Sequence, residues 1–234
     1  MGALAAALLL SGCNMNNTTK GGLIGGAGGG ALGAGLGAAI GALAGGSSGA
    51  KLGAAIGAGV GVAGGATAGV LIGKKMDKAK AAAQAVDNAQ VETVTDKNGL
   101  EAVKVSFDNG ILFKVGKSDL QAKAQASLRQ FANNVLNVYT DCDVAICGFA
   151  SSEGGEELNL TLSQDRANAV RGFLTNTCGV STSQIKSTTG YGEDPQYLVY
   201  DAAGKEDKNA SRRVEVYLYA SEAMINAANA GTLK

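Results

Sequence analysis

One stretch of the sequence, residues 148–170, combines glycine, acidic side chains and an arginine in an order that suits ligand binding. It begins as the end of an apolar strand, turns through residues 151–155, and continues as an amphipathic helix with Glu156 and Glu157 in its first turn. Unpaired backbone N–H groups at such a loop and helix N-terminus bind anions. Arg166, further along the helix, adds a cation that can hold an anion through two hydrogen bonds. The stretch therefore predicts a pocket for an anionic group.

The composition excludes several classes of function. The chain of 234 residues contains no His, so a catalytic triad, a metal cluster or a general base that uses His is ruled out. Its formal net charge is zero and it has no long basic run, which argues against nucleic acid as a partner. Glu153 and Glu156 could form a carboxylate pair for sugar hydrolysis, but they lie on one short loop and not across a cleft. We expect a binding protein that is not an enzyme and carries no cofactor or metal.

The same stretch resembles the signature of the OmpA-like domain, a family that binds peptidoglycan. The family's loop usually reads G-H/Y-T-D-x-x-G and its helix reads N-x-x-L-S-x-x-R-A. The matching positions here are Gly148, Gly154, Asn159, Leu162, Ser163, Arg166 and Ala167. Residues 211–215 resemble the family's closing N-R-R-V-E, with Ser in place of Asn. The resemblance covers roughly residues 100–219 and implies an α+β fold, a two-layer sandwich of βαβαβ(loop)β order.

The resemblance also implies which residues bind peptidoglycan. In the family, the loop Asp holds the ammonium group of diaminopimelate and the helix Arg holds its carboxylate. Arg166 matches the helix Arg, but the loop Asp is replaced by Ser151, which carries no charge. We expect Glu153, two residues later, to supply the missing carboxylate; the alternative is a domain that has lost this ligand. Asn159 is expected to orient the loop, and Arg212 to border the pocket.

Each of these residues also has a purely structural interpretation. The alternatives are a surface ion pair of Arg166 with Asp165 or Glu157, a solvated loop position for Glu153, a turn cap for Asn159, and surface ion pairs of Arg212 or Arg213 with Glu215 or Asp207.

The first 13 residues, MGALAAALLLSGC, form an apolar run that ends in the lipobox pattern of bacterial lipoproteins. The resemblance implies that residues 1–12 are removed and that Cys13 becomes the lipidated N-terminus. An ordinary secretory signal with a chance cysteine is the alternative, and the run lacks the Lys or Arg that usually precedes it. Asn14 is not the Asp that would mark inner-membrane retention, so we expect the outer membrane.

Glycine then recurs at every fourth position from residue 21 to residue 73, which is the pattern of a glycine zipper. Residues 21–45 and 52–73 contain no charge, and each could span about 30 Å of hydrocarbon as a helix. Close helix packing in lipid relies on such small residues. We expect a helical hairpin inserted in the membrane; a flexible linker is the alternative. Oligomerised zippers would make a pore, with the later domain only docking it.

The remaining chain predicts the elements of the expected sandwich. A short helix over 74–90 leads to strands at 91–95 and 100–107, joined by an Asn-Gly turn, and to a short strand at 111–113. Ser118 should cap a helix with Leu120, Ala124, Leu128, Phe131, Val135 and Val138 on one face. Strands follow at 144–150, 185–191 and 212–219, and a last helix at 221–230. In the helix of the opening stretch, the apolar face should comprise Leu158, Leu162, Ala169, Val170 and Phe173. The segments are therefore 1–13, 21–73, 74–99, 100–219 and 220–234.

The cysteines left after lipidation are Cys142, Cys147 and Cys178, an odd number for an oxidising compartment. Cys142 precedes a strand and Cys178 follows the helix that returns antiparallel to it, so both should lie at one end of the domain. We predict a Cys142–Cys178 disulfide and a buried thiol at Cys147. In sum, the sequence predicts an outer-membrane lipoprotein whose partners are peptidoglycan and membrane lipid, with homo-oligomers if the zipper associates; a membrane-active pore or assembly factor is the alternative.

Overall fold

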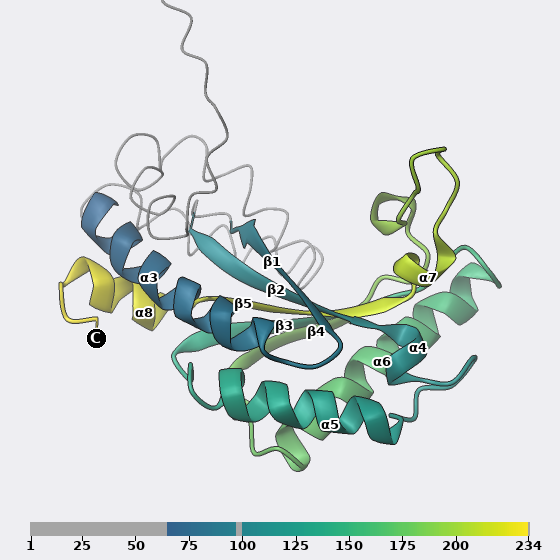
Figure 1. The fold of residues 1–234 in the computed structure, drawn as a ribbon, viewed down its shortest axis with the longest axis horizontal. Coiled ribbons are helices and arrows are strands. Elements are labelled where there is room, and N and C mark those ends of the chain that lie inside the picture. The colour runs from purple at the N-terminus through teal and green to yellow at the C-terminus, as the bar shows by residue number, and fades with distance from the viewer. Residues whose placement is uncertain (1–64, 97–99, 234) are drawn as a thin grey trace, which may run out of the picture.

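A computed structural model describes residues 65–96 and 100–233, and a five-stranded sheet lies at its centre (Figure 1). The strands are β1 Ala89–Thr95, β2 Glu101–Asp108, β3 Cys142–Phe149, β4 Ile185–Gly190 and β5 Arg213–Ala220. Their order in the sheet is β1-β2-β5-β3-β4. The last strand thus lies between β2 and β3, antiparallel to both, while β3 and β4 pair in parallel. The expected hairpin of the first two strands is present, with Val91 opposite Val105.

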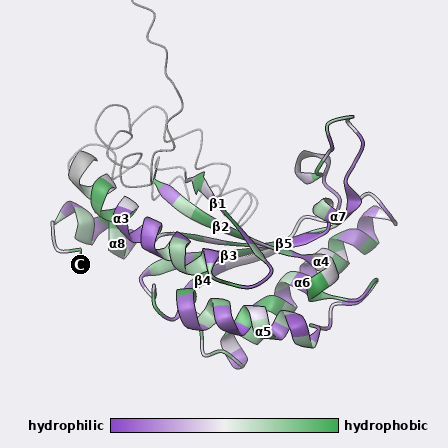
Figure 2. Cartoon of the chain, viewed as in Figure 1, coloured by the Kyte–Doolittle hydropathy of each residue, from purple (hydrophilic) through white to green (hydrophobic). Residues whose placement is uncertain are grey.

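The helices connect and flank these strands. They are α3 Gly65–Gln84, α4 Asn109–Leu112, α5 Ala122–Phe131, α6 Glu156–Asn176, α7 Lys208–Ser211 and α8 Glu222–Asn229, with a π-helical turn at Ala132–Leu136 and a 3-10 turn at Pro195–Tyr197. Residues of both hydropathy classes alternate along α5 and α6 (Figure 2). Such helices bury one side and expose the other.

One main core joins the long helices to a single face of the sheet. Alternate strand residues, such as Val103, Val144 and Val216, enter this core together with buried residues of α3, α5, α6 and α8. Placement of these helices on one sheet face follows the expectation from the sequence. The residues of β3 and β5 that alternate along the strands with the core residues form a second cluster, which contains Ala145, Cys147, Phe149 and Tyr217.

Some local predictions were wrong. The expected strand at 111–113 is instead the short helix α4, and Phe113 makes only an isolated bridge to Leu120. The next helix begins at Ala122 with Gln121 at its N-cap, so Ser118 does not cap it. Its expected apolar face is buried from Ala124 to Val135. Leu120 precedes the helix and is only partly buried, and Val138 is 60% exposed because the helix ends in the π-helical turn at Leu136.

Helix α3 begins earlier than the predicted helix at 74–90 and includes the last three zipper glycines, at positions 65, 69 and 73. The expected segment boundary after residue 73 therefore falls inside one continuous helix. Its buried residues, Ala68, Ile72, Met76, Ala79 and Ala83, recur at spacings of three and four and join the main core. Within the described residues, no helix is long and apolar enough to cross a membrane. Cys13 and the rest of the predicted hairpin lie outside the described residues.

The predicted Cys142–Cys178 disulfide is absent, since Cys142, Cys147 and Cys178 form no disulfide bond in the described part of the chain. The two thiols expected to pair lie in different electrostatic surroundings. Burial raises the pKa of Cys142 to about 12, with a further contribution from Asp141. Burial also raises the pKa of Cys178, but the charge beside that thiol is Arg129. Cys147 is fully buried within β3, as the sequence predicts.

Candidate ligand-binding pocket

A cavity of about 350 Å³ lies where α4, the loop after β3, α6 and α7 meet. It is lined by Asp108, Gly110, Phe113, Val115, Gly116, Ala150, Ser151, Glu153, Leu158, Asn159, Leu162, Arg166, Asn209 and Arg212. All five residues that the sequence predicts to bind peptidoglycan are among them. The structure therefore brings together side chains that are up to 61 positions apart in the chain, from Ser151 to Arg212.

Two glycines let α6 lie close enough to the sheet to place its polar residues in this cavity. A Cβ atom added at Gly148 of β3 would come within 2.2 Å of the Ser163 carbonyl oxygen. One added at Gly190 of β4 would come within 2.2 Å of the Gln164 amide nitrogen. The buried side of α6 consequently contains Asn159, Ser163 and Arg166 as well as apolar residues. The predicted apolar face was partly wrong, since Leu158 is 64% exposed on the cavity rim.

Arg166 is only 3% exposed, and its contacts do not neutralise it. Its Nε–H donates to the carbonyl oxygen of Lys117 over 3.1 Å, and its Cζ lies 5.3 Å from the centroid of the Phe113 ring. Burial, helped by the charge of Arg212, lowers the pKa of Arg166 to about 10, which leaves it protonated at neutral pH. Among the described residues, no carboxylate forms an ion pair with Arg166. The alternative of a pair with Asp165 or Glu157 is therefore wrong.

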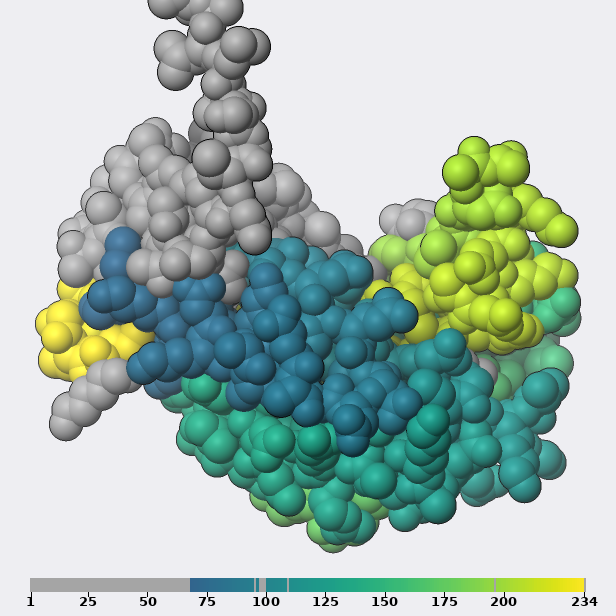
Figure 3. Space-filling view, in the orientation of Figure 1, coloured from purple at the N-terminus to yellow at the C-terminus, as the bar shows by residue number. Residues whose placement is uncertain are grey.

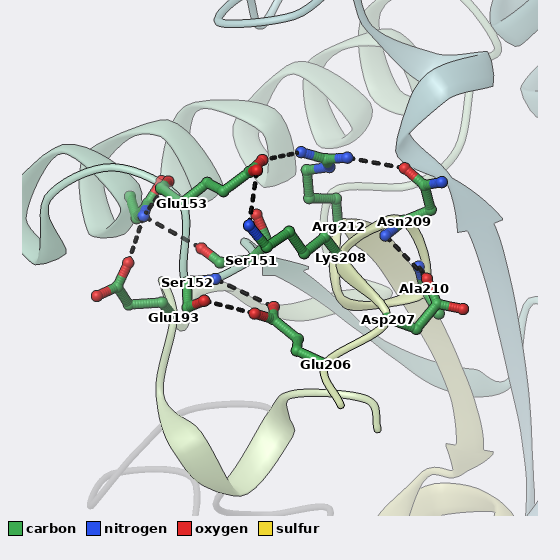
Figure 4. A network of polar contacts seen from close by, with 11 residues as sticks. Ser151, Ser152, Glu153, Glu193, Glu206, Asp207, Lys208, Asn209, Ala210 and Arg212 are labelled. Atoms are coloured by element: carbon green, nitrogen blue, oxygen red, sulfur yellow. Dashed lines mark hydrogen bonds and ion pairs between the residues drawn. The ribbon is translucent and has the colours of Figure 1, made fainter. Parts of the chain in front are cut away.

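Glu153 does not offer a free carboxylate to a ligand. Its Oε1 lies 2.8 Å from Nζ of Lys208, and its Oε2 lies 2.8 Å from a terminal nitrogen of Arg212 (Figure 4). The hydrogen bond and charge of Lys208, together with Arg212, lower the pKa of Glu153 below its ordinary value. Arg212 also donates to Oδ1 of Asn209 at 2.7 Å. Both oxygens of Glu153 are thus occupied by protein cations, which the sequence did not predict.

The loop after β3 is held from inside by Asn159. The side-chain amide of Asn159 donates to the carbonyl oxygens of Ser151, at 3.2 Å, and Glu153, at 2.9 Å, and to the carboxylate of Glu193. Gly154 turns the loop with a φ of +107°, a backbone conformation that favours glycine. These are the bonds expected of a residue that orients the loop. Ser151 is 2% exposed and lines the cavity, so it contributes a buried, uncharged side chain there.

An internal carboxylate already takes one of the loop N–H groups that the sequence assigns to an anion. Glu206 accepts a hydrogen bond of 3.1 Å from the Ser152 amide and another from the Ser152 hydroxyl (Figure 4). The segment that carries Glu206 is part of the lobe near residue 200 that rises from the body in Figure 3. The loop after β3 is therefore held by hydrogen bonds on two sides, to Glu206 of this lobe and to Asn159 of α6.

The two arginines near the end of the signature differ in role. Arg212 lines the cavity, as the resemblance implies. Arg213 instead donates to Glu215 over 2.7 Å and to the carbonyl oxygens of Tyr197 and Ser211, each at 3.2 Å. The predicted pairing of one arginine with Glu215 is confirmed for Arg213, although Glu215 is buried and not on the surface.

Sequence reasoning missed Asp108, Lys208 and Glu206. Asp108 ends β2 and lines the cavity, and its Oδ1 accepts a hydrogen bond of 2.6 Å from the Gly110 amide. Its position directly after a buried strand was a usable signal, because β2 and β3 end near the same edge of the sheet. Lys208 and Glu206 had no such signal, since the sequence around them predicts only a long polar loop, although Lys208 begins α7 in the structure.

Part of this chain is similar to known proteins. Residues 112–212 match the model of the OmpA family. Outer membrane porin F of Pseudomonas aeruginosa is 33% identical over 124 residues, which cover 51% of this chain and 34% of that protein. The peptidoglycan-associated lipoprotein of Brucella melitensis is 36% identical over 98 residues, which cover 42% of this chain and 56% of that protein. The chain thus spans about half the length, or less, of these curated relatives.

Among solved structures, a MotB-like protein from Desulfovibrio vulgaris has the same fold. The TM-score is 0.50 at 18% sequence identity, and the match covers 64% of this chain and 94% of that one. Residues 112–212 of this chain belong to an OmpA-like domain that has homologues among the peptidoglycan-associated lipoproteins.

Proposed function

We propose that this chain is an outer-membrane lipoprotein that binds peptidoglycan without a covalent bond and so links the outer membrane to the cell wall. The proposal rests mainly on Arg166. Its guanidinium is buried, lines the cavity and has no carboxylate partner among the described residues. A buried charge is costly unless it is paired, so a ligand carboxylate is the natural partner. The relative named as a peptidoglycan-associated lipoprotein supports the choice of ligand.

Within peptidoglycan, the group that fits is a stem-peptide residue of the diaminopimelate type. Such a residue presents a carboxylate, which a guanidinium holds with two parallel N–H···O bonds. The exposed rim residue Leu158 and the ring of Phe113 offer apolar contacts to the ligand's aliphatic chain. Binding of this kind positions the domain on the cell wall and turns nothing over.

Co-sedimentation with purified sacculi tests the proposal most directly. We expect the native chain to sediment with sacculi and the Arg166→Ala variant to lose tens to hundreds of fold in affinity for a muropeptide, about 2–4 kcal/mol. Arg171→Ala is the matched control, because it removes an exposed arginine from the same helix. Circular dichroism of each variant separates lost binding from lost folding. If the sacculi sediment while the native protein stays in the supernatant, the proposal is wrong.

The anchor in this proposal is Cys13, which lies outside the described residues. If Cys13 is lipidated, the native protein should take up a labelled fatty acid in bacterial cells, and a Cys13→Ala variant should not. Its affinity for a soluble muropeptide should not change, because the pocket is formed by residues 108–212. A native protein that carries no label, or a variant that carries as much label as the native protein, would contradict the lipid anchor but not the binding site.

The alternative function, a pore or assembly factor built from zipper oligomers, depends on residues 21–64. The described end of the zipper, residues 65–73, belongs to α3 and contributes Ala68 and Ile72 to the domain core. This packing makes the last part of the zipper pattern a structural part of the domain, which favours the binding function over the pore. Ion conductance in lipid bilayers by residues 14–90 would support the pore.

A further inference from the structure

One carboxylate in the cavity, that of Asp108, has an oxygen atom without a partner among the described residues. Four charged side chains line the cavity: Asp108, Glu153, Arg166 and Arg212. Both oxygens of Glu153 are bonded, one to Lys208 and the other to Arg212. Asp108 uses only Oδ1, which accepts the Gly110 amide at 2.6 Å. In the described part of the chain, Oδ2 of Asp108 has no hydrogen-bond or ion-pair partner.

The neighbouring arginine does not neutralise Asp108. Asp108 is the last residue of β2 and lies opposite Arg213 in the register with β5. Arg213 directs its guanidinium elsewhere, to Glu215 at 2.7 Å and to backbone carbonyl oxygens. The Arg213 Cζ also lies 4.2 Å from the centroid of the Phe149 ring, which fixes it over that ring. Asp108 is exposed on the cavity rim and remains accessible to a ligand.

Arg166 is the complementary open charge in the same cavity. Its Nε–H is bonded to Lys117, and its terminal nitrogens have no hydrogen-bond partner among the described residues. As far as the described residues go, the cavity therefore offers one cation and one anion without an ion-pair partner, within a volume of about 350 Å³. Charged groups in ligands are recognised best by such charge-assisted hydrogen bonds. The pair fits a ligand unit that carries both a carboxylate and an ammonium group.

We propose that Asp108 binds the ammonium group of the stem-peptide residue whose carboxylate is held by Arg166. This assignment rests on the proposed function and deepens it. It moves the negative charge of the site to the end of β2, since Ser151 is uncharged and Glu153 is paired with Lys208 and Arg212. The site then selects stem peptides with a free side-chain amine. A peptide whose amine is acylated by a cross-link has lost the positive charge and binds more weakly.

Asp108→Asn is a sharp test because it changes the charge and little else. The asparagine side chain keeps an Oδ1 that can accept the Gly110 amide, so the turn after β2 is preserved. Two ligands are used with the 234-residue chain in calorimetric titrations: a diaminopimelate muropeptide with a free side-chain amine, and the same muropeptide N-acetylated at that amine. For the native chain we expect acetylation to weaken binding about tenfold or more. For Asp108→Asn we expect the same loss with the free amine and no further loss on acetylation.

Two controls make the result specific to Asp108. Asp165→Asn removes an exposed carboxylate from α6 beside Arg166, and we expect it to bind both ligands as the native chain does. Glu153→Gln weakens the contact with Lys208 and Arg212, and any effect it has should be equal for the two ligands. An effect of Glu153→Gln that depends on the amine, with none for Asp108→Asn, would overturn the assignment.

The outcomes separate this inference from the proposed function. Asp108→Asn with native affinity for the free-amine muropeptide, or with an equal loss for both muropeptides, overturns the role of Asp108 while peptidoglycan binding stands. A native chain that binds neither muropeptide, or binding that Arg166→Ala leaves unchanged, overturns the proposed function and this inference with it.

Discussion

Arg166 and Lys117 are joined by a hydrogen bond of 3.1 Å, in which the arginine Nε–H donates to the lysine backbone carbonyl oxygen. The bond ties α6 to the loop between α4 and α5. Together with the contact to the Phe113 ring, it restricts how the guanidinium can rotate. Less rotational freedom is then lost when a ligand binds, which favours affinity.

The first prediction concerns replacement of this arginine by lysine. Arg166→Lys keeps a positive charge but loses both the Nε–H bond and the two-pronged geometry of the guanidinium. We expect affinity for a diaminopimelate muropeptide to fall roughly tenfold to a hundredfold, about 1.5–3 kcal/mol. Isothermal titration measures the loss, and a thermal melt should show that the domain stays folded. A lysine variant that binds as tightly as the native chain would mean that charge alone suffices.

The second prediction concerns the close packing of α6 on the sheet. Gly190→Ala would bring a Cβ within 2.2 Å of the Gln164 amide nitrogen and 2.6 Å of its Cα, both of which are backbone atoms that cannot move aside. We expect the free energy of unfolding to fall by about 3 kcal/mol. Gly172→Ala is the matched control, because its nearest heavy atom is the side-chain nitrogen of Asn176 at 3.9 Å. That helical substitution should stabilise the domain by about 0.5–1 kcal/mol, and denaturant titration of both variants decides.

The sequence predicted the elements that carry strong local patterns. The alternation at residues 91–95 and 100–107, separated by an Asn-Gly turn, identified the β1–β2 hairpin. The signature around residues 148–170 identified α6 and the cavity that Arg166 lines. These features depend on spacing within one segment, which can be read directly from the chain.

Features that depend on distant partners could not be read in this way. The buried side of α6 includes Asn159 and Arg166, so counting apolar residues placed Leu158 inside when it is exposed. Residues 65–73 were assigned to a possible membrane span because they carry no charge, yet Ala68 and Ile72 of this stretch pack in the domain core as part of α3. The ion pair of Glu153 with Arg212 joins positions 59 residues apart, and only the fold reveals that Glu153 is occupied.

The third prediction concerns the thiols. Burial raises the pKa of Cys142 to about 12 and that of Cys147 well above its ordinary value, whereas Cys178 is only partly buried. A thiolate is the reactive species, so at pH 8 a maleimide should label Cys178 first and the other two only when the domain opens. Mass mapping of the labelled, unreduced protein measures this order. A linked pair of peptides containing Cys142 and Cys178 would contradict it and restore the disulfide.

The last prediction concerns acid and the loop after β3. The hydrogen bond and charge of Lys208, with Arg212, lower the pKa of Glu153 from its ordinary value. Burial would raise the pKa of Glu206, but the hydrogen bonds from Ser152 outweigh it and the net shift is downward. A carboxylate whose pKa is lower in the folded state stabilises that state above its unfolded pKa and loses this effect as the pH falls.

We therefore expect the loop to loosen below about pH 4.5 while the sheet stays intact. The measurement is amide hydrogen exchange of Ser152, because its N–H donates to Glu206. The exchange rate is expressed as a protection factor, which corrects for the intrinsic rate at each pH. Protection of Ser152 should fall between pH 7 and pH 3.5, and that of Ile146 in β3 should not. Glu206→Gln should show low Ser152 protection already at pH 7, because it replaces the ionised acceptor by a neutral one. Parallel changes at Ser152 and Ile146 would instead indicate global acid unfolding, and constant protection at Ser152 would show that Glu206 does not hold the loop.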